Sequence, residues 1–363
     1  MSEGKMQYVR LGNSGLKVSK IILGTMQYGN KSWQDWLLEE DEAIKHIKYA
    51  YDHGIQTFDT ADVYSNGLSE KILGNAIKQL KLPREELVIM TKVYQAFPRD
   101  SAANVIVQGL NPDEIGLVNQ WGLSPYLRFR EGKPGATSIG LHRFIPMQVN
   151  LLSTTGIERL TIILHYQGHR FDYNTPIEET MQALHDVVKA GYVRYIGMSS
   201  CYAYQFQAMQ NYAINNKLTP FISMQNHYNL VYREEEREMF PTLKMFGVGS
   251  IPWSPLARGL ITRPLSKQSL RGQTDWFIDR YNKGNTTDIV NRIEEIAKKR
   301  DVSMAQIGVA WVLSKEGVTA PIVGTTNLDN LKDIIAGANV KLTEEEIKYL
   351  EEPYQPLNVI GHF

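Results

Sequence analysis

Four polar residues follow three neighbouring segments that have the composition of buried β-strands, and their chemistry suits the reduction of a carbonyl group. Asp59 and Tyr64 lie in the stretch FDTADVYSNG, Lys92 ends VIMTK, and His169 follows LHYQG. When hydride reaches a carbonyl carbon, negative charge develops on the oxygen and a proton donor must be in place. A phenol with a pKa of about 10 is a weak acid, and a neighbouring ammonium lowers that pKa.

These properties predict a role for each residue. Tyr64 is the proton donor, Lys92 lowers its pKa, Asp59 holds Lys92, and His169 orients the carbonyl oxygen. Each residue taken alone also fits a structural role, as a turn former, a solvated charge or a packing ring, and His165 is a rival to His169. Only their joint position at consecutive strand ends favours catalysis.

The elements that must position these residues alternate along the chain. Short apolar segments predict strands at 21–24, 56–59, 87–91, 160–164, 194–198, 222–225, 248–251 and 321–323. Amphipathic segments predict helices at 41–53, 69–79, 177–190, 204–215, 234–245, 288–300, 305–315 and 328–336, with Ser69 as an N-cap. A β-hairpin is expected over 8–21.

Eight strands with intervening helices predict an α/β fold, a (β/α)8 TIM barrel with its chemistry at the C-terminal ends of the strands. A doubly wound sheet is the competing arrangement, but no G-x-G-x-x-G motif follows the first strand. We expect residues 1–363 to form a single domain.

The composition excludes several classes of function. Lys plus Arg and Asp plus Glu each number 39, which argues against a nucleic-acid or membrane partner. Cys201 is the only cysteine, so an internal disulfide and a cysteine zinc site are excluded, and a reducing, cytoplasmic location is expected. We expect no metal, because the eight histidines show no ligand spacing. The sequence does not predict an oligomeric state.

The motifs FDTADVY, TK and QGHRFD resemble those of the aldo-keto reductases, and in particular the fungal aryl-alcohol dehydrogenase-like and versiconal hemiacetal acetate reductase-like group. The resemblance covers most of residues 7–95 and 167–355. It implies an NADP(H)-dependent reduction of an aldehyde or ketone, with Asp59, Tyr64, Lys92 and His169 as the tetrad. Two alternatives stay open: a nicotinamide-binding redox sensor with little turnover, and a catalytically impaired paralogue.

The resemblance also implies cofactor contacts. At the first strand ends these are Gly24, Thr25, Met26 and Asp59, and the partners of the nicotinamide carboxamide are Ser199 and Gln225. Trp253 matches the ring that stacks on nicotinamide, and Ser254, Leu256 and Arg258 match the pyrophosphate segment. The adenosine-phosphate pocket corresponds to Gly324, Thr326, Asn330 and Asp333. One departure concerns the 2′-phosphate. Residues 322–331 hold no basic side chain before Lys332, which weakens the preference for NADPH over NADH.

Aromatic residues that follow the first and third strands predict the wall of a pocket for an aryl or other bulky carbonyl: Tyr28, Trp33, Trp36 and Tyr94. The identity of the substrate is left open. The segment 123–166 is atypical, because it is longer than the family pattern and lacks a helical period. It is interpreted either as a genuine insertion or as a block disturbed by an error in the gene sequence.

Overall fold

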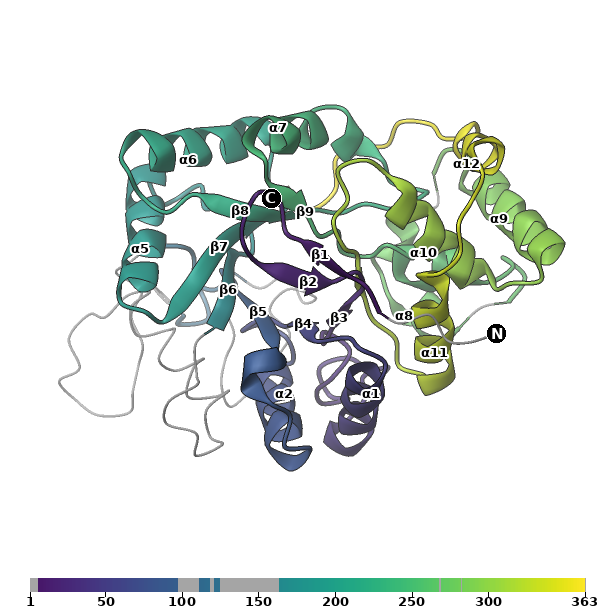
Figure 1. Cartoon of the computed structure of the whole chain (residues 1–363), viewed down its shortest axis with the longest axis horizontal. Coiled ribbons are helices and arrows are strands. Elements are labelled where there is room, and N and C mark those ends of the chain that lie inside the picture. The colour runs from purple at the N-terminus through teal and green to yellow at the C-terminus, as the bar shows by residue number, and fades with distance from the viewer. Residues whose placement is uncertain are drawn as a thin grey trace. The chain divides into compact units, whose positions relative to one another are not determined.

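A computed structural model describes residues 6–96, 111–117, 121–124, 163–267, 269–281 and 283–362 (Figure 1). Residue contacts divide the chain into two units. Unit 1 comprises Met1–Leu23, His53–Ile55 and Ser223–His362, and unit 2 comprises Gly24–Asp52 and Gln56–Ile222.

Unit 2 contains four parallel strands in the order in which they occur along the chain: β4 (Thr57–Asp59), β5 (Val88–Val93), β6 (Ile163–Gly168) and β7 (Val193–Ser199). In the register, Asp59 lies beside Met90 and Lys92 lies beside Gln167. Every residue of β5 is buried, as expected for a parallel strand that is covered on both faces. Adjacent strand ends therefore bring the predicted polar residues to one edge of this sheet.

The helices of unit 2 match the predicted amphipathic segments closely. They are α1 (Glu40–Asp52), α2 (Leu68–Gln79), α5 (Ile177–Lys189) and α6 (Ala203–Asn215), with a 3-10 turn, η1 (Arg84–Glu86). Figure 1 shows α1 and α2 side by side, and the two helices are in contact. Gly191, with a φ of 81°, ends the turn after α5 as expected.

The prediction that Ser69 caps α2 is wrong. The helix begins at Leu68, and its N-cap is Gly67, which has a φ of 82° and provides no side-chain cap. The Ser69 hydroxyl donates instead to the carbonyl of Thr25, at 2.8 Å. A left-handed N-cap suits glycine, which has no Cβ to clash with the backbone.

Unit 1 begins with the predicted hairpin, in which β1 (Tyr8–Arg10) and β2 (Lys17–Ser19) are antiparallel and Val9 pairs with Val18. Parallel pairs follow between β3 (Ile22–Gly24) and β10 (Ile322–Val323), and between β8 (Phe221–Gln225) and β9 (Gly249–Ser250). The larger helices of the unit are α7 (Met239–Phe246), α9 (Thr286–Arg300), α10 (Met304–Ser314), α11 (Leu328–Gly337) and α12 (Glu344–Glu351). Shorter turns are η2 (Glu234–Glu236), η3 (Ala257–Thr262), α8 (Leu270–Thr274) and η4 (Ile278–Tyr281).

The helix predicted over 234–245 is divided in two. The 3-10 turn η2 comes first, and α7 starts only at Met239. Pro241 explains the division, because its ring would clash with the carbonyl of Arg237 in a continuous helix. Proline is tolerated in a first turn, where its missing N–H has no intrahelical partner.

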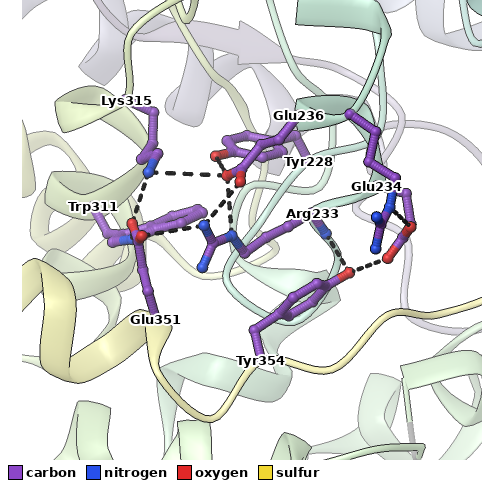
Figure 2. A network of polar contacts seen from close by, with 9 residues as sticks. Tyr228, Arg233, Glu234, Glu236, Trp311, Lys315, Glu351 and Tyr354 are labelled. Carbon is purple, nitrogen blue, oxygen red and sulfur yellow. Dashed lines mark hydrogen bonds and ion pairs between the residues drawn. The ribbon is translucent and has the colours of Figure 1, made fainter.

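A polar network in unit 1 fastens the C-terminal tail to the segment around η2 (Figure 2). The Arg233 guanidinium contacts Glu236 at 2.8 Å and Glu351 of α12 at 3.1 Å. The Tyr354 hydroxyl accepts from the Arg233 N–H at 2.8 Å and donates to Glu234 at 2.6 Å. The tail therefore has a defined course along this segment.

The eight strands β3 to β10, preceded by a hairpin and interleaved with helices, confirm the (β/α)8 fold class. The predicted strand 160–164 corresponds to β6, which starts at Ile163. Most of the atypical segment 123–166 lies outside the described residues. Among the described residues, no helix has the length and apolar character needed to cross a membrane.

Candidate active site

Three of the predicted catalytic residues meet around one ammonium group in unit 2. Lys92 Nζ lies 2.6 Å from Asp59 Oδ2 and 3.2 Å from the Tyr64 hydroxyl, and it donates to the carbonyl of Thr60 at 2.8 Å. The side chains of Lys92 and Asp59 are 0% and 2% exposed. A buried charge pair of this kind is stable only when its hydrogen bonds are satisfied, and the three contacts of Nζ use all three ammonium protons.

His169 lies at the end of β6, and its ring is near Tyr64. Its backbone N–H donates to the carbonyl of Val93 at 2.9 Å, which joins this position to the end of β5. The rings of Tyr64 and His169 are perpendicular, with centroids 6.0 Å apart. The His169 Nδ1 atom is buried without a hydrogen-bond partner among the described residues. The rival, His165, is completely buried within β6.

A left-handed turn determines where the Tyr64 side chain is placed. Ser65, Asn66 and Gly67 have φ values of 50°, 53° and 82°. Such a run is unfavourable for residues other than glycine and asparagine. Ser65 is held by a bond in which its hydroxyl accepts from the N–H of Asn30 at 2.9 Å. The SNG sequence therefore reverses the chain directly after Tyr64 and before α2.

Burial and charge act in opposite directions on the protonation of these groups. Burial raises the pKa of the Tyr64 phenol, and the opposing effect of Lys92 does not cancel this rise. Burial disfavours the charge of Lys92, but Asp59 and Tyr64 outweigh it and raise the pKa of the ammonium. Burial, with Arg170 and Lys92, holds the pKa of His169 well below its usual range. At neutral pH the site thus holds a protonated phenol, a charged ammonium and a neutral imidazole.

Three further residues contact this group and were not predicted. Gln167, the register partner of Lys92, places its amide nitrogen 3.5 Å from Asp59 Oδ1. The Arg170 guanidinium donates to the carbonyl of His169 at 2.6 Å. Its charge helps to lower the pKa of His169 and partly opposes the rise in the pKa of Tyr64. Asp62 is buried in the loop that carries Tyr64. Their strand-end positions are the sequence signal by which they could have been found.

The predicted pocket aromatics lie mostly below the surface of unit 2. Tyr28 has no exposed area, and its ring packs edge-on against His46 of α1. Trp33 and Trp36 form an apolar cluster with Leu37, against which Met26 packs. The ring of Tyr94 contacts that of Trp121.

The residue that follows the first strand forms a backbone hydrogen bond with Asp59 of the predicted tetrad. The N–H of Thr25 donates to the carbonyl of Asp59 at 2.8 Å, and Thr25 is completely buried. Gly24 ends β3, and Met26 follows Thr25. Ser199, at the end of β7, is buried as well.

In unit 1, the predicted pyrophosphate segment has an unusual backbone. Ser254, Ala257, Arg258 and Gly259 all have positive φ, between 47° and 97°. Arg258 bonds Asp275 at 2.5 Å, and Arg271 bonds the same carboxylate at 2.9 Å. Leu256 is buried. Strained backbone of this kind persists only where its surroundings hold it in place, and it is common at ligand sites.

Trp253, at the start of this segment, stacks against His227. The two rings are 4.1 Å apart and nearly parallel, and Tyr232 stacks on His227 at 4.3 Å. The Trp253 side chain remains half-buried. Gln225, at the end of β8, is buried.

The predicted adenosine-phosphate residues lie at and before α11. Gly324 and Asn330 are exposed, and Thr326 is half-buried. The carboxylate of Asp333 is bonded by Ser303 at 2.5 Å and by Gln306 at 2.7 Å, both at the start of α10. Lys332 is paired with Asp329 at 2.9 Å.

The chain is similar to known proteins along almost its whole length. The model of the aldo/keto reductase family matches residues 20–115 and 158–355. The chain is 46% identical to versiconal hemiacetal acetate reductase of Aspergillus parasiticus, over 97% of this chain and 98% of that protein. It is 44% identical to a putative aryl-alcohol dehydrogenase of Saccharomyces cerevisiae, over 97% of this chain and 98% of that protein. A putative aryl-alcohol dehydrogenase of Schizosaccharomyces pombe is also 44% identical, over 98% of this chain and 97% of that protein.

Proposed function

Because the chain belongs to the aldo-keto reductase family, we propose that it reduces an aldehyde or ketone to the alcohol with NADPH, using Tyr64 as the general acid. One observation carries the proposal: a single buried ammonium, Lys92 Nζ, contacts both Asp59 and the Tyr64 hydroxyl. The arrangement supplies a proton donor beside a fixed positive charge, as carbonyl reduction requires.

Each residue has one task in this reaction. A bound nicotinamide supplies the hydride. The Tyr64 hydroxyl donates its proton to the carbonyl oxygen, and Lys92 stabilises the phenolate left behind. Asp59 keeps Lys92 charged and in position, while a neutral His169 donates an N–H to the same oxygen.

The residues that we propose for cofactor binding fit a dinucleotide in chemical type. Arg258 offers a guanidinium beside a strained backbone, and the half-buried ring of Trp253 offers a flat apolar face. Ser199 and Gln225 offer polar groups for a carboxamide. Thr326 and Asn330 lie near the start of α11, where backbone N–H groups favour phosphate. Residues 322–331 hold no basic side chain for a 2′-phosphate, and Lys332 is paired with Asp329. We therefore propose NADPH as the preferred cofactor but not the exclusive one.

We propose an aryl or other bulky carbonyl as the substrate, in line with the aromatic residues Trp33, Trp36 and Tyr94. The half-buried Tyr64 and His169 leave the proton donor within reach of such a molecule. A cytoplasmic location, expected from the single cysteine, is part of this proposal.

The test measures NADPH oxidation with a panel of aromatic aldehydes, for the wild-type protein and for Tyr64→Phe. Loss of the phenol proton should lower kcat by about 100-fold or more, while NADPH still binds with unchanged affinity. Equal turnover by both proteins would refute the role of Tyr64. A folded wild type that binds NADPH without turnover would overturn the reductase proposal in favour of a regulatory one.

A further inference from the structure

The first turn of α2 forms hydrogen bonds with residues at or near the ends of three successive strands, β3, β4 and β5. The Ser69 hydroxyl donates to the carbonyl of Thr25 at 2.8 Å, after β3, and accepts from the Thr60 hydroxyl at 3.3 Å, after β4. The next residue, Glu70, accepts from the Thr91 hydroxyl of β5 at 2.5 Å. Thr91 directly precedes Lys92, so Glu70 holds the strand from the face opposite to the Lys92 side chain.

Asp62 makes a second connection, between the loop that carries Tyr64 and the end of β5. Its backbone N–H donates to the carbonyl of Lys92 at 3.3 Å. Its Oδ1 accepts from the N–H of Val63 at 2.6 Å, and its carboxylate also accepts from the N–H of Tyr94. One side chain therefore fixes residues on both sides of the Tyr64–Lys92 contact.

Asp62 and Glu70 are close enough to interact electrostatically, and both act on the buried Tyr166. Tyr166 is the register partner of Thr91 on β6. Asp62 is 1% exposed, and Glu70 and Tyr166 are 0% exposed. One oxygen atom of each residue has no hydrogen-bond partner among the described residues: Asp62 Oδ2, Glu70 Oε2 and the Tyr166 hydroxyl.

The charge of the two carboxyls follows from their burial. Burial raises the pKa of Asp62 well above its usual range, and the neighbouring carboxyl of Glu70 adds to the rise. Burial raises the pKa of Glu70 to about 7, although Thr91 and Lys92 oppose it. Lys92 is the cation whose charge acts on both carboxyls, from the other face of β5 in the case of Glu70, and it is already paired with Asp59. With a pKa of about 7, Glu70 holds its proton below neutral pH and loses it above.

We propose that Asp62 and Glu70 are positioning residues, two buried acids that fix the Tyr64 loop and the Lys92 end of β5 for proton transfer. Neither carboxyl contacts the reacting atoms. The expected changes in kcat rest on the proposed reductase function, whereas the expected change in the environment of Tyr64 does not.

Four variants test the proposal. Glu70→Ala and Asp62→Ala remove a connection, whereas Glu70→Gln keeps the shape and the hydrogen-bonding capacity of a protonated acid. Asn75→Ala is the matched control, because Asn75 joins the same helix to Glu40 of α1 at 2.9 Å, away from the strand ends. We expect both carboxyl-to-alanine variants to lose kcat by about 10- to 100-fold with NADPH affinity unchanged, as for a small misplacement of reacting groups. The Glu70→Gln and Asn75→Ala variants should keep the wild-type kcat near pH 6.

The pH profile separates positioning from general stability. In the wild type, ionisation of Glu70 above neutral pH adds negative charge across β5 from Lys92, and this charge makes Tyr64 a weaker proton donor. Because glutamine cannot ionise, the kcat of Glu70→Gln should fall less steeply above neutral pH. An unchanged profile, or a Glu70→Gln variant as slow as Glu70→Ala, would overturn the proposal.

A measurement without substrate distinguishes failure of this inference from failure of the proposed function. In protein labelled with ¹³C at the tyrosine Cζ, Tyr64→Phe identifies the Tyr64 signal. We expect Glu70→Ala to shift or broaden that signal, and Glu70→Gln and Asn75→Ala to leave it in place. A Tyr64 signal unaffected by Glu70→Ala would contradict the inference even if the wild type reduces carbonyls. If an alanine variant does not fold, the pH profile of kcat and the ¹³C spectrum of Glu70→Gln still test the proposal.

Discussion

At the scale of single residues, the buried pair of Lys92 and Asp59 links stability to the proposed chemistry. Lys92→Met would leave the Asp59 carboxylate buried without its cation. Removing one partner of a buried ion pair costs about 3–5 kcal/mol, so we expect a loss of that size in the free energy of unfolding. Urea denaturation at neutral pH measures it.

The double variant Lys92→Met, Asp59→Asn is the control for this prediction. It removes both charges, so it should recover most of the lost stability. If Lys92→Met alone were as stable as the wild type, Asp59 would not be ionised in the folded protein, and its proposed role would be contradicted.

Glu70 gives stability a pH dependence with a definite sign. Its pKa rises from 4.5 to about 7 on folding, so between these values the folded state binds more protons than the unfolded state. Stability should therefore fall as the pH rises from about 4.5 to about 7 and should then level off, with a total contribution of at most about 3 kcal/mol.

Urea denaturation of the wild type and of Glu70→Gln near pH 5 and pH 7.5 tests this contribution. The variant has no titrating group at this position, so the wild type should lose more stability than the variant between the two pH values. Identical losses in the two proteins would show that Glu70 does not carry the proton.

The sequence was sufficient to identify the candidate residues, but not to predict the pKa of Tyr64. Strand-end position was enough to identify Asp59, Tyr64, Lys92 and His169 as candidates. The sequence also predicted that Lys92 would lower the pKa of Tyr64, and it does oppose the shift, but burial raises that pKa more strongly. Burial depends on packing from distant parts of the chain, which sequence spacing does not reveal.

At the scale of elements, apolar periodicity was sufficient to locate most helices and strands. The bounds of α5 and α9 differ from the predicted ranges by no more than two residues. Errors arose where local chemistry competes with periodicity. Ser69 was expected to cap α2 but bonds Thr25 in the core, and Pro241 divides the helix predicted over 234–245.

The C-terminal tail depends on one hydroxyl for two of its contacts. In Figure 2 the Tyr354 hydroxyl lies between the backbone of Arg233 and the carboxylate of Glu234. Tyr354→Phe would leave both groups without this partner, which costs about 1–3 kcal/mol. We expect faster hydrogen exchange over residues 352–362, measured by mass spectrometry.

Tyr349→Phe provides the comparison for the tail prediction. The Tyr349 hydroxyl also bonds a glutamate, Glu295, at 2.6 Å, but it lies at the surface. Its removal should change the free energy of unfolding by about 0.5 kcal/mol or less. Equal exchange of the tail in both variants would show that Tyr354 does not anchor it.

At the scale of the whole molecule, the relatives extend over almost the full chain, whereas the two ranges matched by the family model omit residues 116–157. Most of the atypical segment 123–166 lies in this gap. A stretch without periodicity carries no signal of the structure that it adopts, so the fold of this segment could not be predicted from the sequence.

The expectation of one domain gives a prediction for the unfolding of the full chain. The proposed tetrad lies in unit 2, whereas Trp253 and Arg258 lie in unit 1. If the chain is one cooperative domain, calorimetry should show a single transition whose calorimetric and van't Hoff enthalpies agree. NADPH at about 100 times its Kd should raise the whole transition, because binding then adds about 2.7 kcal/mol to stability. Two separate transitions, only one of which responds to NADPH, would show instead that the units unfold independently and that the single-domain prediction is wrong.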